Sequence, residues 1–434
     1  MGGKRVGLGC RSFVYGIRVT YFCWLIGSSH MKIRSITYFC NPKYPLDEKV
    51  FQAAGDFFSE ARSAYEAAGY EVQTTRLATI PFPKLLGGKH INDLPKLGEQ
   101  LETLIQQLGV GHLSLGPALP ESPSSYEIIA EAVAASQNIF FGGVMGDKNA
   151  GLALAAIKAC ANVIVKAAPI DPNGFANLRF AALANVRAGS PFFPAAYHKG
   201  NQPAFAIATE AADLAVNAFQ SAKTLEIGRQ DLIAEVERHG QELARVAKGL
   251  SKFSKFFGID FSLAPFPDDA HSLGNAVEKM GVPKIGFHGS LAAAALLTEA
   301  VDCANFPRTG FSGFMQPVLE DSVLAQRAAD GTLTIKDLLL YSAVCGTGLD
   351  TVPLPGDVTA EQLAPLLLDL SALALRLDKP LTARLMPVPG KKTGEPTAFN
   401  FGFFANGKVM ALDSMPLNSS LAGDETISIR PRKR

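Results

Sequence analysis

The sequence has few charged residues and no excess of either sign. Charged side chains make up 19% of its 434 residues, below the roughly 25% usual for soluble proteins, and 41 basic residues stand against 40 acidic ones. Nucleic-acid-binding proteins usually carry a basic excess on one face, so this balance argues against that class. No apolar run reaches the roughly 18–20 residues that a membrane helix needs, so we expect no membrane-spanning segment.

Cysteine is also scarce. The six cysteines are widely spaced and include no Cys-x-x-Cys pair. This spacing argues against a disulfide framework or a zinc knuckle, and it favours a reducing, cytoplasmic compartment.

Residues 1–30 differ from the rest of the chain. They carry four basic residues and the only tryptophan, Trp24, whereas the first acidic residue is Asp47. The apolar stretch at 19–26 resembles a weak signal peptide or a peripheral anchor. Met31, however, opens an ordinary strand pattern. We therefore expect residues 1–30 to be an upstream artefact, with a signal or anchor segment as the alternative.

After Met31, short apolar runs alternate with amphipathic stretches of helical period. This alternation predicts a largely parallel sheet covered by helices on both faces. The middle of the chain, residues 202–257, has a mostly helical pattern. Because there is neither a repeat nor a long linker, we expect residues 31–434 to form one large α/β domain.

The familiar nucleotide and hydrolase motifs are incomplete. The run at 345–351 begins like a dinucleotide-binding loop but has Thr351 where the third glycine belongs, and the run at 387–393 lacks the first glycine of a phosphate loop. There is no His-Glu-x-x-His helix and no Gly-x-Ser-x-Gly turn. The chemistry must therefore come from less familiar groups.

Four residues in the second half are candidates for catalysis or metal binding. His288 follows a predicted strand at 284–287, where parallel sheets bind ligands, and it is a candidate acid–base group or a cap of the next helix. Cys345 precedes a glycine and could be a nucleophile or a small buried apolar residue. Asp350 and Asp357 flank a proline loop and could orient a substrate or hold a divalent metal ion, although Asp357 also suits a helix cap.

A second set of residues is predicted to bind an anionic substrate. Arg384 and Lys391 form a cationic end suited to a carboxylate or a phosphate, unless the lysine is simply solvated. Asp260 and Ser262 lie two apart on a predicted strand and so face the same side. The remaining candidates for the pocket wall are Asn185, Arg187, His198, Glu320 and Asp321, although a helix N-terminus would also explain the last two.

The order of motifs resembles the uncharacterised bacterial and archaeal family called domain of unknown function 711 (DUF711). The motifs are FGG at 141–143, NVRAGS at 185–190, DFSLAP at 260–265, GFHGS at 286–290, SGFMQPVLED at 312–321, CGTGLD at 345–350, PGD at 355–357 and RLMPVPGK at 384–391. The resemblance covers roughly residues 33–395. It implies a large parallel-stranded α/β barrel similar to that of glycyl-radical enzymes such as pyruvate formate-lyase, and a homodimer. The glycine motif that such a radical needs is missing from the tail, so we expect no glycyl radical.

The sequence thus predicts a cytoplasmic enzyme that acts on a small anionic metabolite, a carboxylate or a phosphate, by acid–base chemistry in a barrel pocket. The alternative is a non-catalytic regulator that binds a small molecule on the same fold. The expected partners are a small-molecule ligand and a second copy of the chain, with neither nucleic acid nor a membrane among them.

Overall fold

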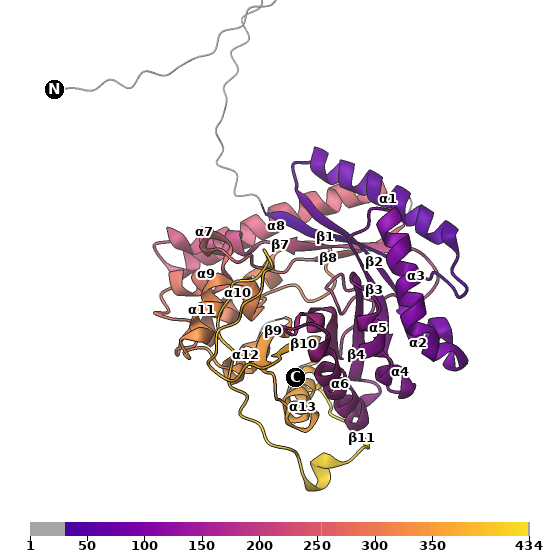
Figure 1. Cartoon of the computed structure of the whole chain (residues 1–434). Helices are drawn as coiled ribbons and strands as arrows, with labels where there is room; N and C mark the ends of the chain where they lie inside the picture. Colours follow the sequence, from indigo (N-terminus) through magenta and orange to yellow (C-terminus); the bar gives the residue numbers. More distant parts are fainter. Residues whose placement is uncertain (1–30, 253, 345, 433–434) are drawn as a thin grey trace, which may run out of the picture.

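The computed structural model describes residues 31–252, 254–344 and 346–432, which form a mixed α/β fold on one large, strongly curved sheet (Figure 1). The strand order along the sheet is β8 (Lys255–Asp260), β7 (Ala204–Glu210), β1 (Lys32–Cys40), β2 (Val72–Pro81), β3 (His112–Ala118), β4 (Ile139–Asp147), β6 (Phe180–Ala184), β10 (Leu381–Val388) and β9 (Gly348–Pro355). Two short strands branch from this path, since β5 (Gly151–Ala153) pairs with β4 and β11 (Thr426–Ile427) pairs with β5.

Most neighbouring strands in this order are parallel, as the sequence predicted. The two exceptions on the main path are β7, which is antiparallel to β1, and β10, which is antiparallel to β6. Ala204 opens β7 beside Phe39, near the end of β1, and Leu381 opens β10 beside Ala184, the last residue of β6. Because β7 and β10 begin at the end of the sheet where β1 and β6 finish, they run in the opposite direction.

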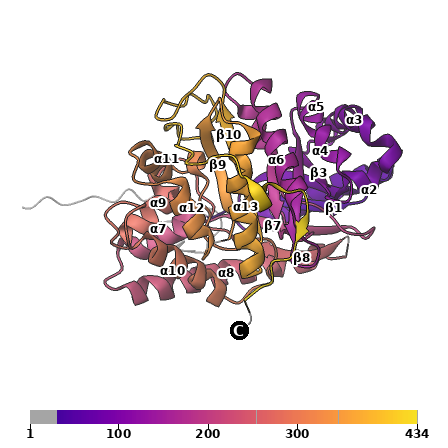
Figure 2. The same cartoon turned by 90° about the horizontal axis from the view of Figure 1, so that it is seen from below.

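Helices surround the outer side of the curved sheet (Figures 1 and 2). They are α1 (Glu48–Ala67), α2 (Phe82–Leu86), α3 (Leu94–Gln107), α4 (Ser124–Glu127), α5 (Ile129–Ala134), α6 (Leu154–Ala167), α7 (Ala212–Gln220), α8 (Leu225–Leu250), α9 (Leu273–Lys279), α10 (Ser290–Cys303), α11 (Ser322–Ala329), α12 (Ile335–Ser342) and α13 (Ala360–Leu377). The predicted helical middle, residues 202–257, contains α7 and α8, but it also contains β7 and the start of β8, which the sequence pattern did not predict. Helices α6 and α13 pack side by side near β10 (Figure 2).

The main hydrophobic core lies between these helices and the outer face of the sheet. On α1, Asp47 caps the N-terminus, and aromatic residues at helical spacing point to the sheet. Phe57 packs against Tyr38 of β1 and Phe205 of β7, with ring centroids 5.2 and 4.9 Å apart. Each such aromatic side chain stabilises the fold by roughly 1.5–3 kcal/mol through burial.

The inner face of the sheet is covered by a loop instead of helices. We call residues 185–203, which connect β6 to β7, the inner loop. Its carbonyl at Ala196 accepts a hydrogen bond from Ser114 Oγ of β3 at 2.8 Å, and its amide at His198 donates to the carbonyl of Thr79 on β2, also at 2.8 Å. These bonds fix the inner loop across the concave side of the sheet, so the space that is left there is small.

The outermost strands of the described sheet are β8 on one side and β9 on the other. These two strands do not pair with each other within the described residues. The extended segment 308–317 lies next to both. Isolated parallel bridges pair Ile259 and Leu263 with this segment on the β8 side, and another pairs its residue Pro317 with Asp350 of β9.

One predicted strand is wrong. Residues 284–287 form turns and isolated bridges, because Gly286 adopts a φ of +107° that is incompatible with a regular strand. None of the helices in the described residues combines the length and the apolar character that crossing a bilayer requires.

Candidate active site

A cavity of about 310 Å³ lies on the concave side of the sheet. Strands β1, β2, β3, β4, β7, β8 and β10 contribute to its wall, together with the inner loop and the segment that follows β10. Its polar or titratable lining residues are Arg34, Gln73, Thr74, Arg76, His112, Thr209, Asp260, Ser262, Glu320 and Arg384. We call this space the arginine cavity, because three arginines from three different strands meet in it.

Two of these arginines belong to a ladder of alternating charges. Arg34 pairs with Glu210 at 2.8 Å and with Glu320 through a short contact, and Arg384 pairs with Glu320 at 2.8 Å and with Asp350 at 2.5 Å. The order in space is therefore Glu210, Arg34, Glu320, Arg384, Asp350. The three carboxylates are at most 5% exposed and Arg384 is 6% exposed, so water does little to screen the ladder.

The ladder keeps its arginines charged despite their burial. Burial would lower the pKa of Arg384, but Asp350 and Glu320 more than offset this effect and raise it. In Arg34, burial likewise works against the charge, and Glu320 and Glu210 raise the pKa. The carboxyl group of Asp350 behaves differently: burial raises its pKa, Arg384 offsets this only in part, and its Oδ2 has no hydrogen-bond partner.

The third arginine, Arg76 on β2, is not part of this ladder. Its Nε donates to Thr74 Oγ1 at 2.9 Å and its guanidinium lies over the ring of Phe193, 5.1 Å from the centroid. Within the described residues, no carboxylate forms an ion pair with it. Burial and the nearby charge of Arg34 lower the pKa of Arg76 to about 9, although the charge of Glu320 works in the opposite direction. Arg76 is thus a half-buried cation that faces a cavity and forms no ion pair within the described residues.

His112, the first residue of β3, lines the cavity next to this cation. Its ring packs edge to face on Phe140 at 5.2 Å, and its Nδ1 has no hydrogen-bond partner. Burial, together with the charge of Arg76, lowers the pKa of His112 to about 4. The imidazole is therefore neutral at pH 7.

The pKa of His112 predicts a loss of stability in acid. An unfolded histidine takes up its proton near pH 6.5, but the folded His112 does so only near pH 4. Between these values the unfolded state binds more protons, so the free energy of unfolding falls as the pH falls, by up to about 3 kcal/mol at pH 4. His112→Gln should therefore lose less stability than the unchanged protein between pH 7 and pH 4.5. The free energy of unfolding in urea at these two pH values measures the difference.

The matched control for this measurement is the exposed His90→Gln. The pKa of His239 on α8 is also lowered to about 4, mainly by burial. The free energy of unfolding should therefore keep the part of its pH dependence that comes from His239 in both variants. An unchanged pH dependence in His112→Gln would contradict the neutral, buried state of His112.

Asp260 and Ser262 form the β8 side of the cavity. Ser262 Oγ donates to Asp260 Oδ1 at 2.6 Å, and the amides of Phe311 and Ser312 donate to the same carboxylate at 3.0 and 2.8 Å. Gly310 makes this close approach possible, because a Cβ there would lie 2.1 Å from Asp260 Oδ2. Burial nevertheless raises the pKa of Asp260.

Backbone strain occurs beside two of the buried carboxylates. Thr351, next to Asp350, has a φ of +43°, and Ser312, which binds Asp260, has a φ of +44°. A β-branched residue in the left-handed region is a rare outlier that costs on the order of 1–3 kcal/mol. Such strain tends to occur at functional sites, and both positions here adjoin the arginine cavity or its ladder.

The structure places five of the residues predicted from sequence at this site. Asp260, Ser262, Glu320 and Arg384 line the cavity, and Asp350 is paired with Arg384.

The other predicted residues lie elsewhere. Asp321 is fully buried and accepts hydrogen bonds from the first turns of α9 and α11, so it acts as a structural cap. Asn185 and Arg187 lie at Asp378 in a different cavity of about 420 Å³. The buried His198 borders yet another one.

His288, Lys391 and Asp357 do not line the arginine cavity either. His288 and Asp357 are exposed, and Lys391 lies in the turn after β10, where its carbonyl accepts from the amide of Gly356. Cys345 lies outside the described residues.

In the described part of the chain, no three His, Cys, Asp or Glu side chains lie together in a group that could hold a metal ion. Asp357 comes after the end of β9, well away along the strand from Asp350.

Sequence reasoning missed Arg34, Arg76, Glu210 and His112. A usable signal existed, because Arg34 and Arg76 occur inside apolar strand patterns, and arginine is almost never buried unless it is paired or functional. The pairing of β1 with β2, which brings Thr37 opposite Arg76, could not be deduced from local pattern alone.

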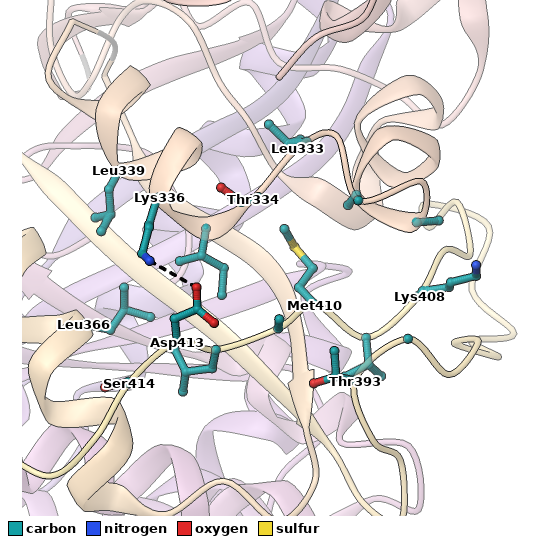
Figure 3. Close-up of a pocket in the computed structure, with 18 of the residues that line it drawn as sticks. Leu333, Thr334, Lys336, Leu339, Leu366, Thr393, Lys408, Met410, Asp413 and Ser414 are labelled. Carbon is teal, nitrogen blue, oxygen red and sulfur yellow. Dashed lines mark hydrogen bonds and ion pairs between the residues drawn. The ribbon is translucent and has the colours of Figure 1, made fainter. Parts of the chain in front are cut away.

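A larger cavity of about 390 Å³ opens at the surface between α12, α13 and residues 408–414 (Figure 3). Lys336 and Asp413 point toward one another across it and pair at 3.1 Å, with both side chains more than 70% exposed. Its other labelled residues are a mixture of apolar and polar side chains, and none of the predicted site residues borders it. The arginine cavity is therefore the better candidate for chemistry.

A profile of the family described as "Uncharacterised ACR (DUF711)" matches residues 25–402. The chain is 34% identical over 281 residues to a UPF0210 protein of Pyrobaculum arsenaticum, a match that covers 62% of this chain and 61% of that relative. It is 27% identical over 388 residues to a UPF0210 protein of Acetivibrio thermocellus (84% and 85% covered) and 26% identical over 427 residues to one of Ruminiclostridium cellulolyticum (91% and 93%). The chain thus spans about three fifths of the Pyrobaculum relative.

Proposed function

This chain belongs to the DUF711 family, and we propose that it is an enzyme that binds a small organic anion at Arg76 and transfers a proton on it. The observation that carries this proposal is the half-buried guanidinium of Arg76, which lines the cavity and forms no ion pair with a carboxylate of the described residues. Buried charges are normally paired, so an unpaired one at a cavity wall marks a place for a ligand of opposite charge.

The neighbouring groups support a role for each side of the cavity. The planar fork of Arg76 suits the two oxygens of a carboxylate or a phosphate. His112 is neutral at pH 7, and a bound anion would offset the charge of Arg76 that helps to lower its pKa, which would make His112 a stronger base toward a substrate held there. The ladder of Arg34, Glu320 and Arg384 is fixed by its ion pairs, which keeps the opposite wall rigid while the ligand is bound.

The proposal includes the barrel that the sequence predicts. The isolated bridges of segment 308–317 to β8 and to β9 support a closed ring, in which this segment fills the gap between the two end strands. A closed wall would exclude water from the arginine cavity and strengthen every charge interaction in it. The likeness to glycyl-radical enzymes stays a prediction of fold only.

Small anions provide the test of the binding step. Thermal unfolding of the full chain with acetate, malonate, succinate or inorganic phosphate should show stabilisation that grows with concentration, because a ligand of the folded state adds about 2.7 kcal/mol at one hundred times its Kd. Arg76→Gln should weaken the best of these anions roughly 30-fold or more.

The matched control is Arg187→Gln, an arginine that is 74% exposed on its side chain and lies outside the arginine cavity. Binding that survives Arg76→Gln would contradict the proposed site. The catalytic step is tested by incubating the stabilising acid with the enzyme in D₂O and following proton exchange by NMR. An acid recovered without exchange or conversion would favour a non-catalytic regulator instead.

A further inference from the structure

The arginine cavity has an unusual second property, which is the number of phenylalanine rings around its cations. Its lining includes Phe140, Phe192, Phe193, Phe401 and Phe403. We propose that the natural ligand is a carboxylate that carries an apolar body of about the size of an aromatic ring. This inference rests on the proposed function and names its class of substrate.

The rings stand directly beside the charged groups. Phe193 lies under Arg76 and packs edge to face against Phe140 at 5.5 Å. On the other side, Phe192 lies 5.8 Å from the guanidinium carbon of Arg384. A ligand whose carboxylate reaches Arg76 must therefore place the rest of its atoms among aromatic faces and edges. Such surfaces favour apolar rings, which pair with them at centroid distances of about 4.5–7 Å.

The remaining two rings come from the segment after β10. Phe401 packs on Phe175 at 5.1 Å, and Phe403 packs on Phe266 at 5.6 Å. Phe403 is nevertheless 39% exposed, although it lines the cavity. A ligand with an apolar body would cover this ring, whereas a small polyanion such as phosphate or malonate would leave it in contact with water.

The apolar wall also limits how polar the ligand can be. Besides the rings, Leu178, Pro191 and Met315 line the cavity, and the carboxylates of the ladder already engage both other arginines. A second anionic group on the ligand would find no free cation among the described residues of this wall. One negative charge at Arg76 and an apolar remainder therefore match the cavity best.

The test compares matched acids by calorimetric titration of the full chain. Burying a phenyl group stabilises a complex by roughly 1.5–3 kcal/mol, so 3-phenylpropionate should bind at least about 10-fold more tightly than propionate. Benzyl alcohol, which has the ring without the charge, should bind more weakly than 3-phenylpropionate. Phe403→Ala should reduce the ratio between the two acids several-fold and leave propionate unchanged.

The outcomes separate this inference from the proposed function. The control variant is Phe287→Ala, since Phe287 is 47% exposed and does not line the cavity, and it should keep the full ratio. Equal affinity for the two acids, with both lost in Arg76→Gln, would overturn the aromatic ligand and leave the anion site standing. Absence of binding for every acid would overturn both.

Discussion

Arg384→Met is expected to lower the free energy of unfolding by about 3–5 kcal/mol. Arg384 pairs with Asp350 at 2.5 Å and with Glu320 at 2.8 Å, and all three side chains are buried. Methionine fills much of the same space but leaves Asp350 without a counter-ion and Glu320 with one of its two. Isolated buried carboxylates are far more costly than the pair from which they came, because neither water nor a partner solvates them.

Urea unfolding at pH 7 measures this loss, with an exposed pair as the control. Arg245 pairs with Glu242 on the surface of α8, and Arg245→Met should cost less than about 1 kcal/mol. Adding Asp350→Asn to Arg384→Met should recover part of the stability, since it removes one of the stranded charges. If Arg384→Met costs no more than the surface control, the ladder does not exist as described.

Arg76→Met is expected to have the opposite sign and to raise the free energy of unfolding by about 2 kcal/mol. Burial lowers the pKa of Arg76 to about 9, which means that the fold opposes the charge that the side chain carries at pH 7. Methionine keeps an apolar stem of similar length against Phe193 and removes the charge. The hydrogen bond to Thr74 and the contact between the guanidinium and the Phe193 ring are lost, and each contributes about 1 kcal/mol.

The same variant should lose the binding of small carboxylates, so stability and ligand affinity would change in opposite directions. Urea unfolding and calorimetric titration of one protein preparation measure both quantities, and Arg187→Met on the surface controls for the loss of an arginine. A large loss of stability in Arg76→Met would show that the fold itself needs this cation. That result would contradict its assignment as a ligand-binding group.

These two arginines illustrate how structural and functional charges differ in one cavity. Arg384 is satisfied by carboxylates of the chain, so its removal damages the fold. Arg76 forms no ion pair in the described part of the chain, and the ligand that we propose would offset its cost to the fold. Natural proteins commonly retain destabilising groups where function requires them.

Part of this site could be predicted from the sequence. The strand patterns that contain Asp260, Ser262 and Arg384 were recognisable, because polar residues interrupt otherwise apolar runs there. The largely parallel sheet and the helical middle followed from hydrophobic periodicity. His288 and Lys391 show the limit of this reasoning, since a strand end locates a residue along the chain but not relative to a cavity on the inner face.

Other predictions stay as they were. The homodimer and the cytoplasmic compartment came from the resemblance and from cysteine usage, and Cys345 lies outside the described residues. The divalent ion suggested for Asp350 and Asp357 stays a prediction as well. Asp350 is instead seen here as the partner of Arg384, and Asp357 as an exposed residue beyond β9.

The sequence alone determined the class of the fold, the family and the polar character of its strand ends, because these depend on local periodicity and on ordered motifs. Only the tertiary structure decided which charges are paired. Arg34 and Glu210 lie 176 positions apart, and Arg34 and Glu320 lie 286 apart, so nothing local links them. The tertiary fold brings them together, and it leaves Arg76 without an ion pair among the described residues. Whether a charge is structural or available for a ligand depends on that pairing, which local sequence pattern does not encode.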